Sequence, residues 1–331
     1  MTRILGRGLP LVALAALLAL PYSTVRLPGL FEGTLNAPGT LQLLAICLIF
    51  GGLALGYDLL FGRAGLLSFG HALYIAAGAY GTDVLISHAH WPLWAAVAAT
   101  VPAAAVLAAL LGAVALRTTG IAFAMVTLAF AQVGWIVVGR DPGGLTGGEE
   151  GLPLDTAGLP AALAGVANTV NLYWLALAFL LVVVVVVHGI DRAPLGRVLT
   201  GLRDDERRVA VLGLSAYRLK LGTFVLAGAL AALGGAVHAL VVGGASPHLA
   251  SADLTLSLIV MAVLGGAGTR WGAVLGGVVY AYLDQRLTQV GGSVPGPLGQ
   301  PLFVLGTLFV LAVYFAPGGL TGVARLVRRT A

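Results

Sequence analysis

Long apolar segments separated by short polar turns recur along almost the whole chain. Most of them approach or exceed the roughly 20 residues that a helix needs to cross the hydrocarbon core of a membrane. The pattern predicts an all-α fold, a polytopic transmembrane helix bundle with about ten spans, at 9–27, 41–61, 66–88, 92–116, 119–139, 171–190, 217–243, 254–269, 271–288 and 300–317. The segment 254–269 is short and ends in glycines, so a broken or re-entrant helix is the alternative to a full span there.

Composition supports the membrane interpretation. Of 331 residues, 59% are hydrophobic and only 9% are charged, and the mean hydropathy is +0.99. A soluble domain carries about 25% charged residues, so this chain has too few charges to cover a water-soluble surface. The 48 glycines suit helices that pack closely in lipid. We therefore treat residues 1–331 as a single transmembrane domain.

The positions of the basic residues predict the orientation in the membrane. With the N-terminus inside, 15 of the 18 Lys and Arg residues face the cytoplasm, and only Arg26, Arg140 and Arg286 lie outside. Both termini are then cytoplasmic, residues 140–170 form an external loop, and 191–216 form the only substantial cytoplasmic loop. The net charge of +5 is explained by cytoplasmic loops, and no nucleic-acid partner is expected.

The N-terminal segment has a second interpretation. Two arginines followed by an apolar run are also typical of a secretory signal peptide, whose removal would leave nine spans. The segment lacks a clean cleavage site with small residues, which favours a membrane span.

The cytoplasmic loop 191–216 predicts one or two short helices. Pro194 suits a first helical turn with Asp191 as a possible cap, and Gly213 suits a helix end. An apolar stripe is formed by Val198, Leu202, Val209 and Leu212. A helix with such a stripe and mixed charges suits the docking of a cytosolic protein, whereas a solvated loop whose arginines only fix the topology is the alternative.

The stretch "GLLSFGHALYIAAGAY", Gly65–Tyr80, is unusually polar for a membrane span. Ser68, His71 and Tyr74 are spaced at i, i+3 and i+6, roughly one face of a helix, and a broken helix there would direct its N-terminal amides at a substrate carboxylate. These residues, with Thr127, are candidates for the wall of a translocation path. The alternative is helix packing, with His71 bonded to a neighbouring carbonyl and Thr127 to its own helix.

Six motifs occur in a characteristic order: "LGYDLLFGRAGLLSFGHALYIAAGAY", "GIAFAMVTLAFAQV", "TGGEEGL", "GRVLTGLRDDERRVAVLGLSAYRLKLGTFVLAGALAALGGAV", "VLGGAGTRWGAVLGG" and "FAPGGLTG". In these motifs the chain resembles the permease subunits of ABC importers for branched-chain amino acids, in the second of the two paired permease types. The resemblance runs from about Leu53 to Gly322. The chain departs from the family pattern at Asp58, where the family usually has Asn, and at Arg63, where it often has an aromatic residue.

The resemblance implies a multi-pass protein of the bacterial cytoplasmic (inner) membrane that works by alternating access. It implies a heterodimer with a second permease subunit, an external solute-binding protein, and two cytosolic ATPase subunits docked on 191–216. The residues implied in ATPase coupling are Gly196, Arg203, Asp204, Asp205, Glu206 and Gly213.

The chain lacks the features of an enzyme or an ATPase. A phosphate-binding loop needs Gly-x-x-x-x-Gly-Lys-Ser/Thr, and the only lysine, Lys220, is not in one. We expect no cofactor and no metal in this chain, with ATP bound by partner subunits. Branched-chain amino acids are the expected substrates, urea or short amides are the alternative within the family, and an ATP-independent secondary transporter or channel is the alternative outside it.

Overall fold

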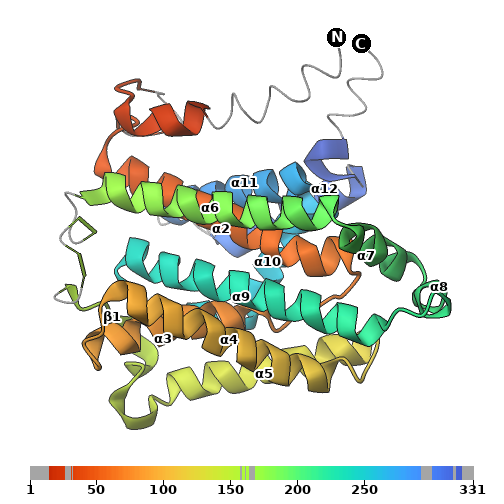
Figure 1. Ribbon diagram of the computed structural model, residues 1–331. Coiled ribbons are helices and arrows are strands. Elements are labelled where there is room, and N and C mark those ends of the chain that lie inside the picture. The colour runs from red at the N-terminus through yellow and green to blue at the C-terminus, as the bar shows by residue number, and fades with distance from the viewer. Residues whose placement is uncertain are drawn as a thin grey trace, which may run out of the picture.

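Helices form most of the structure. The computed structural model describes residues 15–26, 31, 33–156, 159–160, 162–163, 168–291, 300–315 and 318–322, and Figure 1 shows long helices lying side by side in a bundle. The main helices are α2 (Pro38–Asp58), α3 (His71–Ser87), α4 (Leu93–Ala115), α5 (Ile121–Gly139), α6 (Thr169–Arg192), α7 (Pro194–Asp204), α8 (Glu206–Val211), α9 (Ala216–Val242), α10 (Ala252–Gly265), α11 (Arg270–Gly291) and α12 (Pro301–Phe315). The predicted all-α membrane fold is confirmed in this part of the chain.

Five of the described helices are long and apolar enough to cross a membrane. They are α2 with the π-turn that follows it (Pro38–Arg63), α4, α5, α6 and α9. At about 1.5 Å per residue, the 14 residues of α10 fall short of a hydrocarbon core about 30 Å thick, as expected for a broken or re-entrant helix. Of the predicted span 9–27, residues 15–26 are described; they are helical over 15–19, continue as a 3-10 helix at Leu20–Tyr22 and are not helical from 23 to 26, while 9–14 and 27 lie outside the described residues. The count of ten spans therefore stays a prediction.

Small residues bring the central helices into backbone contact. Helix α9 packs against α2, α3, α4 and α6, and a Cβ atom at Gly78 of α3 or Gly235 of α9 would collide with the backbone of the other helix. Helices α10 and α11 meet in the same way at Gly272 and Gly276. Such contacts are typical of helices in lipid, where close packing replaces the hydrophobic effect as the main attraction.

The two predicted loops lie at opposite ends of the bundle. Helices α7 and α8 project from one end, while the strand β1 (Leu152–Pro153) lies at the other (Figure 1). There β1 pairs antiparallel with β2 (Gly244–Ala245), with Leu152 opposite Ala245. The segment between α6 and α9 forms two short helices, as predicted.

The start of α3 differs from the prediction. A helix from residue 66 was expected, but α3 begins at His71, and residues 65–70 are not helical. Ser68 therefore does not share a helix face with His71 and Tyr74. The expected cap of α7 was also wrong, because Ala193 occupies the N-cap position and the Asp191 carboxylate pairs with arginines instead.

Candidate functional site

Helix α2 ends in a π-turn at the α7 end of the bundle. The π-turn spans Leu59–Arg63, and the amide of Ala64 donates to the Leu59 carbonyl five residues back. A Cβ atom at Gly62 would collide with the carboxylate of Asp58 and the amide of Gly268, so only glycine fits there. Because π-turns occur frequently at functional sites, this turn marks the region around it as a candidate site.

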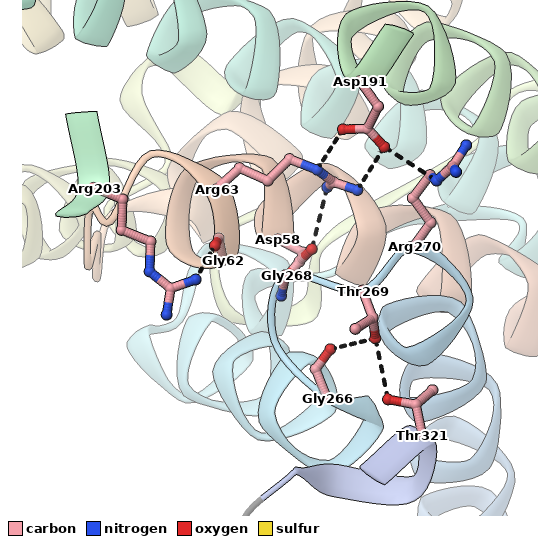
Figure 2. Close-up of polar contacts among 10 residues, drawn as sticks. All are labelled: Asp58, Gly62, Arg63, Asp191, Arg203, Gly266, Gly268, Thr269, Arg270 and Thr321. Atoms are coloured by element: carbon pink, nitrogen blue, oxygen red, sulfur yellow. Dashed lines mark hydrogen bonds and ion pairs between the residues drawn. The ribbon is translucent and has the colours of Figure 1, made fainter. Parts of the chain in front are cut away.

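Charged side chains from distant parts of the chain meet on this turn, in what we call the ionic cluster: Asp58, Arg63, Asp191 and Arg270 (Figure 2). Arg63 is 7% exposed; its Nη1 lies 3.2 Å from Asp58 Oδ2 and its Nε lies 2.8 Å from Asp191 Oδ1. The other Asp191 oxygen lies 3.1 Å from Arg270 Nε. Two cations and two anions thus balance, which offsets the cost of removing them from water.

The ionic cluster also holds the loop between α10 and α11. Asp58 Oδ1 accepts a hydrogen bond of 2.7 Å from the amide of Gly268, and Arg270 contacts Nδ1 of His188. Gly268 has a φ of +79° and lies in the turn between α10 and α11, outside the close helix contact at Gly272 and Gly276. The cluster therefore joins α2, α6 and α11 at one end of the bundle.

Arg203 connects helix α7 to the same turn. Its Nη1 donates to the carbonyl oxygen of Gly62 at 2.5 Å (Figure 2). Its stem runs over Gly65, where a Cβ atom would lie 3.0 Å from Arg203 Cγ. Arg203 makes no ion pair with the residues described.

The other predicted coupling residues lie along α7 and α8. Gly196 sits against the end of α6, where a Cβ atom would meet the Ile190 carbonyl at 2.5 Å. Asp204 ends α7, and Asp205 caps α8 by accepting from the Arg207 amide at 2.9 Å. The remaining two residues are Glu206 and Gly213. Glu206 Oε2 lies 2.5 Å from Lys220 Nζ, and Gly213, shortly after α8, has a φ of +77°.

The predicted apolar stripe of these helices is buried only in part. Leu202 and Val209 are buried, together with Leu199, which the prediction missed. Leu212 was wrongly placed on the stripe, because it is 76% exposed, beside Val211 at 87%. One face of the α7–α8 pair is thus anchored in the bundle, and an apolar tip projects from it.

The segment 65–70 leads from the π-turn to α3 and is tied to three helices. Tyr57 of α2 donates to the Ser68 carbonyl at 2.8 Å, and the Phe69 amide donates to Thr127 Oγ1 of α5 at 3.1 Å. The Ala72 amide donates to Thr255 Oγ1 of α10 at 2.9 Å. Because these amides already have partners, the expected carboxylate-binding helix start is not free in this conformation.

The predicted path residues are all buried. Ser68, His71, Tyr74 and Thr127 are each at most 2% exposed. The His71 ring lies between Tyr57 and Tyr74, with ring centroids 5.2 and 6.0 Å away, and neither imidazole nitrogen has a hydrogen-bond partner of ordinary geometry among the described residues. Thr127 also donates to the Ala124 carbonyl of its own helix, as one alternative expected. The four residues are close in space but closed to solvent in this conformation.

Sequence reasoning missed Asp191 and Arg270. These residues lie far from Arg63 along the chain, and only the fold brings the three together. One signal was present: Asp58 and Arg63 both depart from the family pattern, and a pair of departures with opposite charge five residues apart indicates an ion pair. The structure contains that pair.

Comparisons with known proteins agree on a family. The sequence model of the family described as "Branched-chain amino acid transport system / permease component" matches residues 39–313. The high-affinity branched-chain amino acid transport system permease protein LivM of Escherichia coli is 28% identical over 310 residues, which cover 87% of this chain and 71% of that protein. The protein of the same name from Salmonella typhimurium matches with the same identity and coverage.

More distant similarities extend to an archaeon and to a solved structure. The probable branched-chain amino acid transport permease protein LivM of Methanocaldococcus jannaschii is 26% identical over 155 residues, covering 44% of this chain and 45% of that protein. A chain of the structure "PsaBC from Streptococcus pneumoniae in complex with Fab" superposes with a TM-score of 0.47 at 12% identity, covering 84% of this chain and 91% of that chain.

Proposed function

This chain belongs to the family of branched-chain amino acid transport system permease components, and from that premise we propose that it is the permease subunit of an ATP-driven importer. It moves branched-chain amino acids across the cytoplasmic membrane by alternating access. Its partners are a second permease subunit, two cytosolic ATPase subunits and an external solute-binding protein. ATP is bound and hydrolysed by the ATPase subunits, and this chain carries no cofactor of its own.

The observation that carries the proposal is the α7–α8 pair. Its inner face is anchored by Leu199, Leu202 and Val209, while Val211 and Leu212 project from the end of the bundle. Exposed apolar residues on an anchored, charged helical segment suit a protein partner. A family of transport permeases together with such a segment supports an ATPase docked at this end.

The partner assignment is tested by changing the tip without disturbing the anchor. Val211→Glu with Leu212→Glu should abolish co-purification of the ATPase subunits while the permease heterodimer still forms, because a charged tip cannot bury against an apolar surface. Leu145→Glu, in the loop at the opposite end, is the control and should retain the ATPases. Stoichiometric ATPase binding by the double variant would refute docking on this tip.

A larger replacement tests the whole segment. Exchanging 196–213 for a Gly/Ser linker should also abolish ATPase binding, and binding at full stoichiometry would exclude α7–α8 as the docking element. Because the linker removes the Arg203 contact as well, the yield of the membrane heterodimer is measured in parallel.

The orientation of the chain is part of the proposal. The distribution of Lys and Arg supports a cytoplasmic location of α7, α8 and both termini, and an external location of residues 140–170. Thr156 and Thr200 are both exposed and lie toward opposite ends. Cysteines at these two positions, in a Cys47→Ala background, should react with impermeant reagents added to opposite sides of the membrane. Reaction of both from one side would contradict the orientation.

The substrate follows from the relatives. The E. coli and M. jannaschii relatives are named as permeases for branched-chain amino acid transport, and we extend that substrate class to this chain. Urea and short amides are the competing substrates. Competition for binding to the solute-binding protein separates them, since leucine should displace a bound ligand that urea leaves in place.

A further inference from the structure

Arg203 was expected to contribute to ATPase coupling, but its guanidinium is directed into the bundle. It donates to the Gly62 carbonyl in the π-turn, and its stem covers Gly65 (Figure 2). Arg203 and Arg197 lie on the same helix and are both exposed, but Arg197 makes no side-chain hydrogen bond or ion pair with the described residues. Of these two arginines, only Arg203 donates a hydrogen bond to the turn at the end of α2.

The turn that Arg203 contacts continues directly into segment 65–70. Gly65 has a φ of +69° and redirects the chain after the π-turn. From there the Ser68 carbonyl is held by Tyr57, the Phe69 amide by Thr127, and the Ala72 amide by Thr255. An unbroken series of contacts therefore runs from α7 through the turn to α5 and α10.

Free space lies next to Arg203. A cavity of about 250 Å³ is lined by Arg203 with Gly65, Leu66 and Phe123, and a second of about 690 Å³ by Arg203 with Arg63 and Arg270. A closely packed interior resists displacement, whereas a side chain that lines two cavities has free volume beside it. The contact between Arg203 and the turn is therefore not enclosed by close packing.

The ionic cluster supplies a fixed reference for that movement. Asp58 and Arg63 hold the far side of the π-turn against Asp191 and the Gly268 amide, and each of these groups is paired. A shift of α7 would then move the π-turn at Gly62, where Arg203 is bonded to it, while the ionic cluster holds the turn at Asp58 and Arg63. The displacement is then passed to segment 65–70, because that segment continues from the moving side.

We propose that Arg203 is a positioning residue for transport, which passes the movement of α7 to segment 65–70 and so opens the buried region around Ser68, His71 and Thr127. The proposal rests on the proposed function, since ATPase subunits are what move α7. The decisive interaction is donation to the Gly62 carbonyl and not a charge presented to the ATPase.

The test compares substitutions at Arg203 with one at Arg197 in the complete reconstituted importer. Arg203→Met keeps an unbranched apolar stem and removes the donor, Arg203→Lys keeps a donor, and Arg197→Met removes a matched charge from the same helix. Solute uptake and ATP hydrolysis are measured on the same vesicles. We expect Arg203→Met to lower the uptake per ATP hydrolysed about tenfold, as loss of a charge-assisted hydrogen bond allows. Arg203→Lys should restore most of it, and Arg197→Met should leave it unchanged.

A second measurement follows the movement directly, and it remains informative if the Arg203→Met variant does not fold. Ser68 is fully buried, so the labelling of Ser68→Cys in a Cys47→Ala background reports opening. Addition of ATP should increase the labelling rate about tenfold, and Arg203→Lys should keep most of that increase, with a small loss because one flexible ammonium replaces the rigid guanidinium fork.

Three results would overturn the inference. They are unchanged uptake per ATP in Arg203→Met, loss of ATPase subunits from Arg203→Met but not from Arg203→Lys, and Ser68→Cys labelling that does not respond to ATP. The second result would make Arg203 a docking charge. Absence of ATP-dependent uptake by the wild-type complex would instead refute the proposed function, so the two failures are distinguishable.

Discussion

At the α7 end of the bundle, charged side chains from several elements pair with one another, whereas at the start of α3 the polar contacts among the described residues are made by hydroxyl and backbone groups. Asp58, Arg63, Asp191 and Arg270 form the first set of contacts. The second set is exemplified by Thr127 and Thr255, which accept from backbone amides. Helix α9 beside this second region packs on α3 through glycines.

The difference follows from the surroundings. Charges are costly in the membrane interior and concentrate near helix ends, where paired arginines and carboxylates reach water. Neutral hydroxyls and small residues satisfy the backbone and bring helices together at much lower cost within the bundle. One region is therefore sensitive to loss of a charge, and the other to any added volume.

The largest effect is expected where helices meet through backbone. Gly235→Ala places a Cβ against the Ile75 carbonyl of α3, and we expect destabilisation of about 3 kcal/mol or more, because neither backbone can move without separating α3 from α9. Gly222→Ala is the matched control on the same helix, since its Cβ would meet nothing within 4 Å. The yield of monodisperse protein and its unfolding temperature measure the effect. Equal stability of the two variants would contradict the glycine contact.

A smaller effect is expected in the ionic cluster. Asp58→Asn should lower the free energy of unfolding by about 2 kcal/mol. This is less than the usual cost of breaking a buried ion pair, because Arg63 keeps its ion pair with Asp191. Combining it with Arg63→Phe should recover stability, since removing both charges leaves no unpaired ion. Denaturant unfolding in detergent measures both variants. A double variant less stable than Asp58→Asn would show that the pair is not the source of the loss.

An exposed ion pair is the control for that comparison. Arg208 lies 3.1 Å from Asp205, and its side chain is 85% exposed. Arg208→Ala should change the free energy of unfolding by less than about 1 kcal/mol, because solvent screens the pair.

The smallest effect concerns the loop that follows α5. Asp141 accepts hydrogen bonds from the amides of Thr146 and Gly147, at 2.7 and 3.1 Å, and the Thr146 bond in particular lowers its pKa. A lowered pKa in the folded state stabilises the loop above the unfolded value of about 3.9 and loses that stabilisation as the pH falls through the folded value. Between about pH 5 and about pH 3 the unfolding temperature of the wild type should therefore fall slightly more than that of Asp141→Asn. The same fall in both proteins would contradict this role.

The sequence predicts local features of this protein better than long-range ones. The apolar runs locate the long helices, and Pro194 and Gly213 locate the beginning of α7 and the end of α8. These features depend on residues that are neighbours along the chain. The same holds for the Asp58–Arg63 pair, whose members are five residues apart.

Other features depend on contacts that the sequence pattern does not contain. The break at 65–70 lies at the start of a predicted span, and the backbone groups there and at the start of α3 find partners in Thr127 and Thr255, far away in sequence. Asp191 looked like a helix cap because it stands just before α7, but Arg63 and Arg270 lie closer in space. The site could therefore be located approximately from sequence, and its geometry could not.

Uptake of labelled leucine by vesicles that contain this chain, its partner permease and the two ATPases tests the proposed function as a whole. The solute-binding protein is added on one side and ATP is enclosed on the other. We expect leucine to accumulate above its external concentration, and only when ATP and the solute-binding protein are both present. Leucine that equilibrates without ATP, or urea that accumulates in its place, would refute the proposed function.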